Sequence, residues 1–146
     1  MDNTHPVERF FSAPHPINKY LRVRFRSVDA TTLTVELEAP SAYVVDRKTG
    51  EVHSGLATLV LDTVMGGAVM GWLDVIRPIA TTGLTVQHLR RAKAGDNLIC
   101  RVSKVGIHAD IAHVTGQLLT ADGEVLSIAT GTFMTGTRAK PLGVRV

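Results

Sequence analysis

Hydrophobic and polar positions alternate along much of the chain, and this pattern predicts β-strands. In 20–27, three apolar residues alternate with arginines, and in 31–39 three aliphatic residues alternate with Thr and Glu. We expect two strands there, joined as a hairpin and ended by Pro40. Similar β-rich stretches, separated by short turns at 95–96, 106–109 and 121–123, predict four more strands at 81–89, 97–105, 111–120 and 124–135.

One stretch is apolar on nearly all sides, and it predicts a long helix at 54–72. Ser54 is a candidate N-cap, and the Arg77-Pro78 pair lies beyond the expected end. Asp62 in the middle would cost about 2.5–3.5 kcal/mol inside a bilayer, so we expect a buried helix and no membrane span. Three glycines lower helix propensity by about 1 kcal/mol each relative to Ala, which predicts close approach of a neighbouring backbone.

The order of elements is strand, strand, long helix and four strands. Short successive turns favour an antiparallel sheet, and the economical way to bury such a helix is against one long curved sheet. We therefore expect a single α+β domain over 1–146. Segment 1–19 contains three prolines and is expected to be irregular, and the basic tail 138–146 is expected to be loosely held.

Composition narrows the class of protein. The 146 residues are 45% hydrophobic and 20% charged, which excludes a disordered or fibrous chain. A lone cysteine, Cys100, cannot form an internal disulfide, and the N-terminus has no secretory pattern, so we expect a cytoplasmic protein. The net charge of +3 and the 5% aromatic content do not favour a nucleic-acid partner.

The most informative candidate chemistry lies along the predicted helix. A carboxylate among apolar residues is costly unless it is paired, so Asp62 is either a structural group or a nucleophile or general base. Ser54 and Gly55 stand at the helix start, where free N–H groups can polarise a carbonyl or hold an oxyanion. The chain at Ser54 lacks the G-x-S-x-G pattern of a serine hydrolase.

Spacing along the helix then constrains the site. Ser54 and Asp62 are 62 − 54 = 8 residues apart, which is about 12 Å along one helix. If both groups act on one reacting carbon, they must come from two antiparallel copies of the helix, with a two-fold axis near Thr58. This hypothesis predicts two shared sites per dimer.

Two other groups of residues carry candidate chemistry. Arg90, Arg91 and Lys93 form either an exposed charged turn or a phosphate-binding patch. The histidines and aspartate in 108–113 do not share one strand face, so we expect no metal there.

Three short motifs resemble those of hotdog-fold acyl-CoA thioesterases of the phenylacetyl-CoA (PaaI-like) type. The segment G-E-V-H-S-G-L-A-T-L-V-L-D at 50–62 resembles the H-G-G-x6-D helix of that family. The segment 81–95 is similar to the strand that follows in the family and ends in L-R-P-x-x-x-G. The segment D-G-E-V-L-S-I-A-T-G-T-F at 122–133 resembles its closing strand. The match covers roughly residues 20–135.

The resemblance implies a hotdog fold, a homodimer that shares one continuous sheet, and a homotetramer. It implies metal-free and cofactor-free hydrolysis of acyl-CoA. Asp62 would be the nucleophile or general base, the Ser54 N–H would polarise the carbonyl, and His53 would be structural or lie near the thioester. Thr81 would place water. Arg90, with Arg91 and Lys93 as helpers, would bind CoA phosphates.

The chain departs from the family pattern in three places. Ser54 occupies the position of a glycine in the family motif, Arg47 the position of a common Asn, and Arg91 the position of a proline. Two rival functions remain open at this point: an acyl dehydratase or hydratase, and an acyl-CoA-binding or regulatory protein without turnover. The segment 41–52 and Phe10-Phe11 are expected to shape the acyl pocket.

Overall fold

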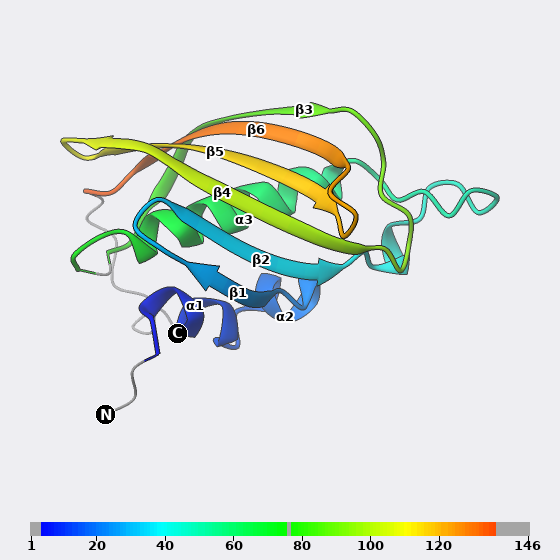
Figure 1. Ribbon diagram of the computed structural model, residues 1–146, viewed down its shortest axis with the longest axis horizontal. Helices are drawn as coiled ribbons and strands as arrows, with labels where there is room; N and C mark the ends of the chain where they lie inside the picture. The colour runs from blue at the N-terminus through cyan, green and yellow to red at the C-terminus, as the bar shows by residue number, and fades with distance from the viewer. Residues whose placement is uncertain (1–3, 76, 137–146) are drawn as a thin grey trace.

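A six-stranded antiparallel sheet curves around one long helix in the computed structural model, which describes residues 4–75 and 77–136 (Figure 1). The sheet order is β1-β2-β4-β5-β6-β3. The strands are β1 Arg24–Val28, β2 Thr32–Glu38, β3 Ala80–His88, β4 Asn97–His108, β5 Ile111–Thr120 and β6 Val125–Met134. The central helix is α3, Gly55–Gly71, and the arrangement is the hotdog fold expected from the sequence.

The core lies between α3 and the concave face of the sheet. Inward-pointing residues of β2, β4 and β5 are buried, and so are most apolar residues of α3 between Leu56 and Met70; Leu59 is partly buried. This burial on all sides agrees with the all-round apolar pattern of the helix. No helix in 4–75 or 77–136 is long and apolar enough to cross a membrane.

The N-terminal segment is not irregular, as the sequence had suggested. It forms α1, Pro6–Ser12, and α2, Pro16–Leu21. Pro6 and Pro16 each occupy the first turn of a helix, where the missing N–H costs no hydrogen bond, so two of the three prolines begin helices; Pro14 lies between them. The tail 138–146 lies outside the described residues.

The first hairpin is shorter than predicted. Helix α2 extends to Leu21, and Arg22 ends it in the left-handed conformation at φ 51°, so β1 begins at Arg24 instead of residue 20. The predicted pairing of β1 with β2 is confirmed. The turn predicted at 106–109 is also misplaced, because β4 continues to His108 and the chain turns at Ala109 with φ 50°.

Two glycines of α3, Gly67 and Gly71, receive side chains of α1, whereas Gly66 faces Ile79 and Phe133. A Cβ at Gly67 would lie 2.7 Å from Cζ of Phe11 and 2.9 Å from Cε1 of Phe10, and one at Gly71 would lie 2.8 Å from Cβ of Val7. The expected approach of a neighbouring backbone is therefore not observed at Gly67 and Gly71. Side chains of α1, a helix that was not predicted, pack there instead.

Candidate active site

The start of α3 is held by His53. Its Nδ1 accepts a hydrogen bond from the Gly55 N–H at 2.9 Å, while its own backbone N–H donates to the carbonyl of Tyr43 at 2.8 Å. The Ser54 side chain makes no cap hydrogen bond, so the imidazole caps the helix in place of the predicted serine. Among residues 4–75 and 77–136, no acceptor forms a hydrogen bond with the Ser54 N–H, so this donor is available to a ligand oxygen.

Asp62 lies two turns further along α3 and is half-buried. The Thr81 hydroxyl at the beginning of β3 donates to Asp62 Oδ1 at 2.9 Å. The second carboxylate oxygen has no hydrogen-bond partner among the residues that the structure describes. Both residues line a cavity of about 290 Å³ between α3, α1 and the start of β3. Asp62 and Thr81, both candidate site residues from the sequence, are 19 positions apart in the chain and are hydrogen-bonded in the structure.

Within one protomer, the helix start and the carboxylate face different hollows. His53 and Ser54 line a small hollow with Arg90 and Arg91, whereas Asp62 lines the 290 Å³ cavity. The eight-residue separation along a continuous helix corresponds to about 12 Å. A single protomer therefore does not place the Ser54 N–H and the Asp62 carboxylate on one reacting carbon.

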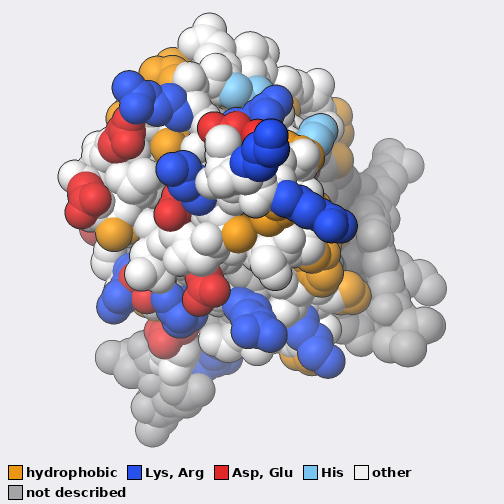
Figure 2. Space-filling model, turned by 90° about the vertical axis from the view of Figure 1, so that its right-hand side faces the viewer, with side chains coloured by type: hydrophobic (Ala, Val, Ile, Leu, Met, Phe, Trp, Pro, Cys, Tyr) orange, Lys and Arg blue, Asp and Glu red, His pale blue; other side chains and the backbone are white. Residues whose placement is uncertain are grey.

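The basic residues after β3 lie close to the helix start. Arg90 pairs with Glu124 at 2.8 Å and Arg91 with Glu51 at 3.7 Å, and both arginine side chains are at least half exposed. Figure 2 looks onto the end of the molecule that faces right in Figure 1 and shows Lys and Arg side chains spread among acidic ones, with histidines beside them. Exposed ion pairs of this kind contribute little and can exchange partners.

His88 is a residue of this region that sequence reasoning left without a partner. Its Nδ1 lies 3.1 Å from Oγ of the fully buried Ser127, and its Nε2 lies 3.4 Å from Oγ1 of Thr58 on α3. It lines the same hollow as Ser54. His88 is 30 positions from Thr58 and 39 positions from Ser127 in the chain, so no local sequence pattern indicates either contact. Only knowledge of the β3–β6 register, which places His88 opposite Ser127, could have indicated the second one.

Two other features offer no comparable chemistry. Burial raises the pKa of the Cys100 thiol to about 12, so this cysteine is not a nucleophile at neutral pH.

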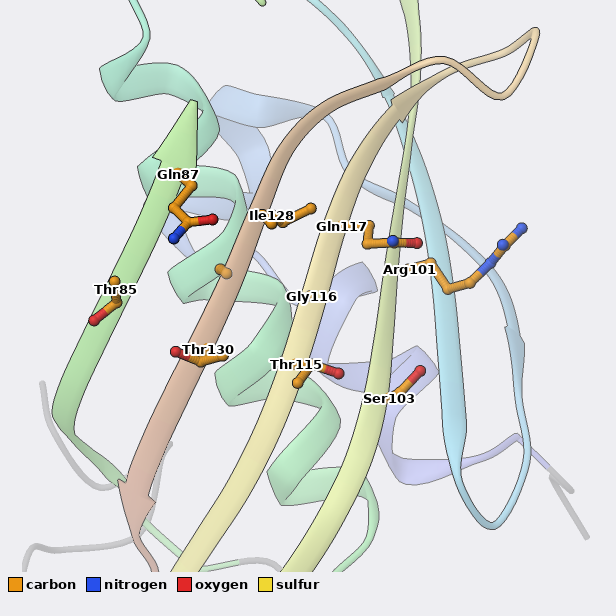
Figure 3. Close-up of a pocket in the computed structure, with 10 residues that line it drawn as sticks. Thr85, Gln87, Arg101, Ser103, Thr115, Gly116, Gln117, Ile128 and Thr130 are labelled. Carbon is orange, nitrogen blue, oxygen red and sulfur yellow. The ribbon is translucent and has the colours of Figure 1, made fainter. Parts of the chain in front are cut away.

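A groove of about 400 Å³ lies on the sheet face opposite α3, where Thr, Ser and Gln side chains and Arg101 point outward (Figure 3). None of the predicted site residues lines it. Within the described ranges, no three His, Cys, Asp or Glu side chains are grouped closely enough to hold a metal ion.

Comparisons with solved structures support the same fold. A Ralstonia eutropha JMP134 protein named as a "putative thioesterase, phenylacetic acid degradation-related protein" is 28% identical, with 88% of this chain and 98% of that chain covered and a TM-score of 0.76. The PaaI protein of the E. coli phenylacetic acid degradation operon is 15% identical, with coverages of 84% and 85% and a TM-score of 0.73.

A Streptococcus pneumoniae TIGR4 protein, named as a hypothetical thioesterase and solved with coenzyme A, is 18% identical, with coverages of 80% and 88% and a TM-score of 0.69. No family model matches the sequence. No curated protein matches it either.

Proposed function

We propose that this chain, whose hotdog fold and PaaI-like thioesterase neighbours agree with the resemblance of its sequence, hydrolyses acyl-CoA thioesters. The observation that carries the proposal is that α3 presents two groups: the Ser54 N–H at its start, which has no acceptor among residues 4–75 and 77–136, and the half-buried Asp62 carboxylate two turns further along. An N–H that polarises a carbonyl, and a carboxylate that attacks it or activates water, are the two groups that metal-free acyl transfer requires.

The proposal requires a dimer, because the two groups are too far apart in one protomer. Two antiparallel α3 helices related by a two-fold axis near Thr58 would bring Ser54 of one subunit to Asp62 of the other. Each dimer would then have two identical sites, and neither subunit alone would be active.

Strand β3 supports the same two-fold axis independently. It is an edge strand of the sheet. Its residues Ala80–His88 are mostly exposed and include no Lys, Arg, Asp, Glu or proline, so the strand lacks the features that usually prevent an edge from pairing with another strand. Its Thr81 contacts Asp62 and its His88 contacts Thr58, so β3 runs antiparallel to α3. Antiparallel pairing of two β3 strands about their middle would place the Asp62 end of one subunit against the Ser54 end of its partner.

The reaction then follows from these positions. The Ser54 N–H holds the thioester oxygen as negative charge develops on it. Asp62 of the other subunit acts in one of two ways: it accepts the proton of a water that attacks the carbonyl carbon, or it attacks the carbon itself to form an anhydride that water then hydrolyses. In both routes the C–S bond breaks, the CoA thiolate takes up a proton, and the acid leaves. Thr81 holds Oδ1, and since no described residue bonds the other carboxylate oxygen, that oxygen would be the one that acts.

His53 and the basic residues would complete the site. His53 fixes the direction of the first turn of α3 through its bond to the Gly55 N–H. Arg90, Arg91 and Lys93 lie on the loop beside it. Arg90 and Arg91 would exchange their exposed acidic partners for CoA phosphates, whose oxygens suit bidentate pairing with guanidinium groups, and Lys93 would add a further positive charge. Loss of Arg90 should therefore raise KM more than it lowers kcat.

The first test is release of free thiol from a panel of aliphatic and aryl acyl-CoAs by wild type and Asp62→Asn. The single cysteine is buried and protonated, so it does not contribute to a thiol-reagent signal. We expect wild type to turn over at least one substrate and Asp62→Asn to lose most of kcat. Full hydrolysis by Asp62→Asn would refute the proposal, and tight acyl-CoA binding without hydrolysis by wild type would favour a binding protein.

A matched pair of variants tests the proposed donor. Ser54→Ala keeps the backbone N–H and should retain activity. Ser54→Pro removes this N–H, and φ at Ser54 is −61°, close to the value that proline imposes just before a helix. We expect Ser54→Pro to lower kcat by about 10²–10³-fold with far-ultraviolet circular dichroism unchanged. Equal activity of the two variants would exclude the Ser54 N–H from catalysis.

A further inference from the structure

The cavity beside Asp62 is lined by polar side chains around Asp62 and by mostly apolar residues elsewhere, with the ring of His15 beside Phe10 as a further polar group. Asp62, Thr63 and Thr81 supply the polar end, and Gly66, Ile79 and Phe133 belong to its apolar wall. It follows α3 toward the C-terminus of the helix, since its residues on this helix extend from Asp62 to Met70. That span of eight residues corresponds to about 12 Å.

A second apolar cavity of about 230 Å³ lies further along the same helix. Its lining includes Pro6, Val7, Ala13 and Gly71. Two residues, Phe10 and Met70, line both cavities. They therefore form the partition between the hollow that contains Asp62 and the hollow beyond it.

The position of Phe10 in this partition is fixed from two sides. Gly67 lacks a side chain, and a Cβ there would lie only 2.9 Å from Cε1 of Phe10, so the ring rests directly on the helix backbone. The ring also packs edge-on against Phe11 with centroids 5.0 Å apart, and the Phe10 carbonyl accepts a 2.8 Å hydrogen bond from the buried Asn18 side chain. Phe10 itself is only half-buried because its other face lines the two cavities.

We infer that Phe10, on the N-terminal helix α1, is the residue that limits acyl length in this protein, by closing the Asp62 cavity against the second apolar cavity. The identity of the ligand as an acyl thioester rests on the proposed function, whereas the partition itself rests on the two cavities and their shared residues. Acyl groups in the wild-type protein end at the Phe10 ring. Removal of the ring joins the two cavities into one channel along α3.

The test compares wild type and Phe10→Ala with straight-chain acyl-CoAs from butanoyl to tetradecanoyl. A buried methylene is worth about 0.8 kcal/mol, which corresponds to about fourfold in kcat/KM per added carbon while the chain stays in the cavity. We expect the wild-type series to rise and then stop or fall. The Phe10→Ala series should continue to rise over several further carbons, so that its preference for long over short chains exceeds that of wild type by at least about tenfold.

Two more variants distinguish an effect of opening the partition from an effect of loosening the packing of α1 in general. Met70→Ala opens the partition from the opposite side and should shift the preference in the same direction. Phe11→Leu alters the neighbouring ring on the same glycine, and Phe11 is not among the residues that line either cavity. It should keep the wild-type length limit. An equal shift in Phe11→Leu, or no shift in Phe10→Ala with activity on short chains retained, would overturn the inference.

A binding measurement distinguishes failure of this inference from failure of the proposed function. Calorimetric affinities of S-alkyl-CoA thioethers, which cannot be hydrolysed, are measured over the same chain lengths. A length limit present in wild type and absent in Phe10→Ala supports the inference even if no thioester is turned over. Hydrolysis without any length limit leaves the proposed function standing and refutes the role of Phe10.

Discussion

Replacement of Gly67 by alanine tests whether α1 packs directly on the glycine face of α3. In an ordinary exposed helix this change would be stabilising by about 1 kcal/mol, because alanine has the higher helix propensity. Here the added Cβ would come within 2.7 Å of the Phe11 ring and 2.9 Å of the Phe10 ring. Phe11 is only 4% exposed and cannot move away without displacing the core, so overpacking should cost about 1–3 kcal/mol.

Gly66 is a matched control on the same helix. Alanine at Gly66 gains the same propensity, but its Cβ would lie 3.2 Å from Cδ1 of Ile79, the flexible end of a partly buried side chain. We expect Gly66→Ala to be neutral or stabilising by up to about 1 kcal/mol. Because propensity cancels between the two variants, their difference isolates the packing of α1 on α3, and it should be about 1–3 kcal/mol.

The assay is urea unfolding followed by circular dichroism, with both variants at one protein concentration, since unfolding of a dimer depends on concentration. The free energy of unfolding should be lower for Gly67→Ala than for Gly66→Ala. If Gly67→Ala is as stable as Gly66→Ala or more stable, α1 does not pack on this face as described.

Four further outcomes are expected. Thr81→Val removes the hydroxyl that donates to Asp62 and should lower kcat by about tenfold or more, with little change in KM in steady-state kinetics. His88→Gln, whose amide can still bridge two hydroxyls, should keep more activity than His88→Ala, and equal loss in both would exclude a positioning role. Hydrogen bonds from two backbone N–H groups hold the pKa of the Asp29 carboxyl below its usual range. The carboxylate therefore stabilises the fold above about pH 4, and this stabilisation disappears as pH falls through the lowered pKa. The urea midpoint of wild type should exceed that of Asp29→Asn near neutral pH, and the two midpoints should converge in acid. Cys100 should react with a thiol reagent only after unfolding, and rapid reaction of the native protein would contradict its burial.

The strands and the central helix were predictable because their signals are local. Alternation indicated the strands at 20–27, 31–39 and 97–105, and β-rich stretches between short turns indicated the other three. The helix was expected at 54–72 and is observed at Gly55–Gly71. The N-terminal helices were missed because proline was interpreted as a breaker, whereas Pro6 and Pro16 each occupy a first helical turn. Short helices of this kind are stabilised by packing on other elements more than by their own sequence.

The residues of the candidate site could be selected from the sequence only in part. Asp62 was selected because it lies among apolar residues and Ser54 because it lies at the helix start, and the resemblance to the thioesterases added Thr81. The role of His53 as the cap of α3 depends on the geometry of its side chain, and Ser54 was the better candidate by residue preference. His88 and the Phe10 partition depend on contacts between residues far apart in the chain, which no local pattern contains.

The central claim is that each active site combines the Ser54 N–H of one subunit with the carboxylate of Asp62 from its partner. Co-expression of Ser54→Pro with Asp62→Ala, under two affinity tags, tests it most directly. Each variant alone should be inactive. The purified mixed dimer should contain one intact site and recover about half of the wild-type rate of thiol release. A mixed dimer as inactive as its parents, with wild-type dimers active under the same conditions, would contradict a site shared between subunits.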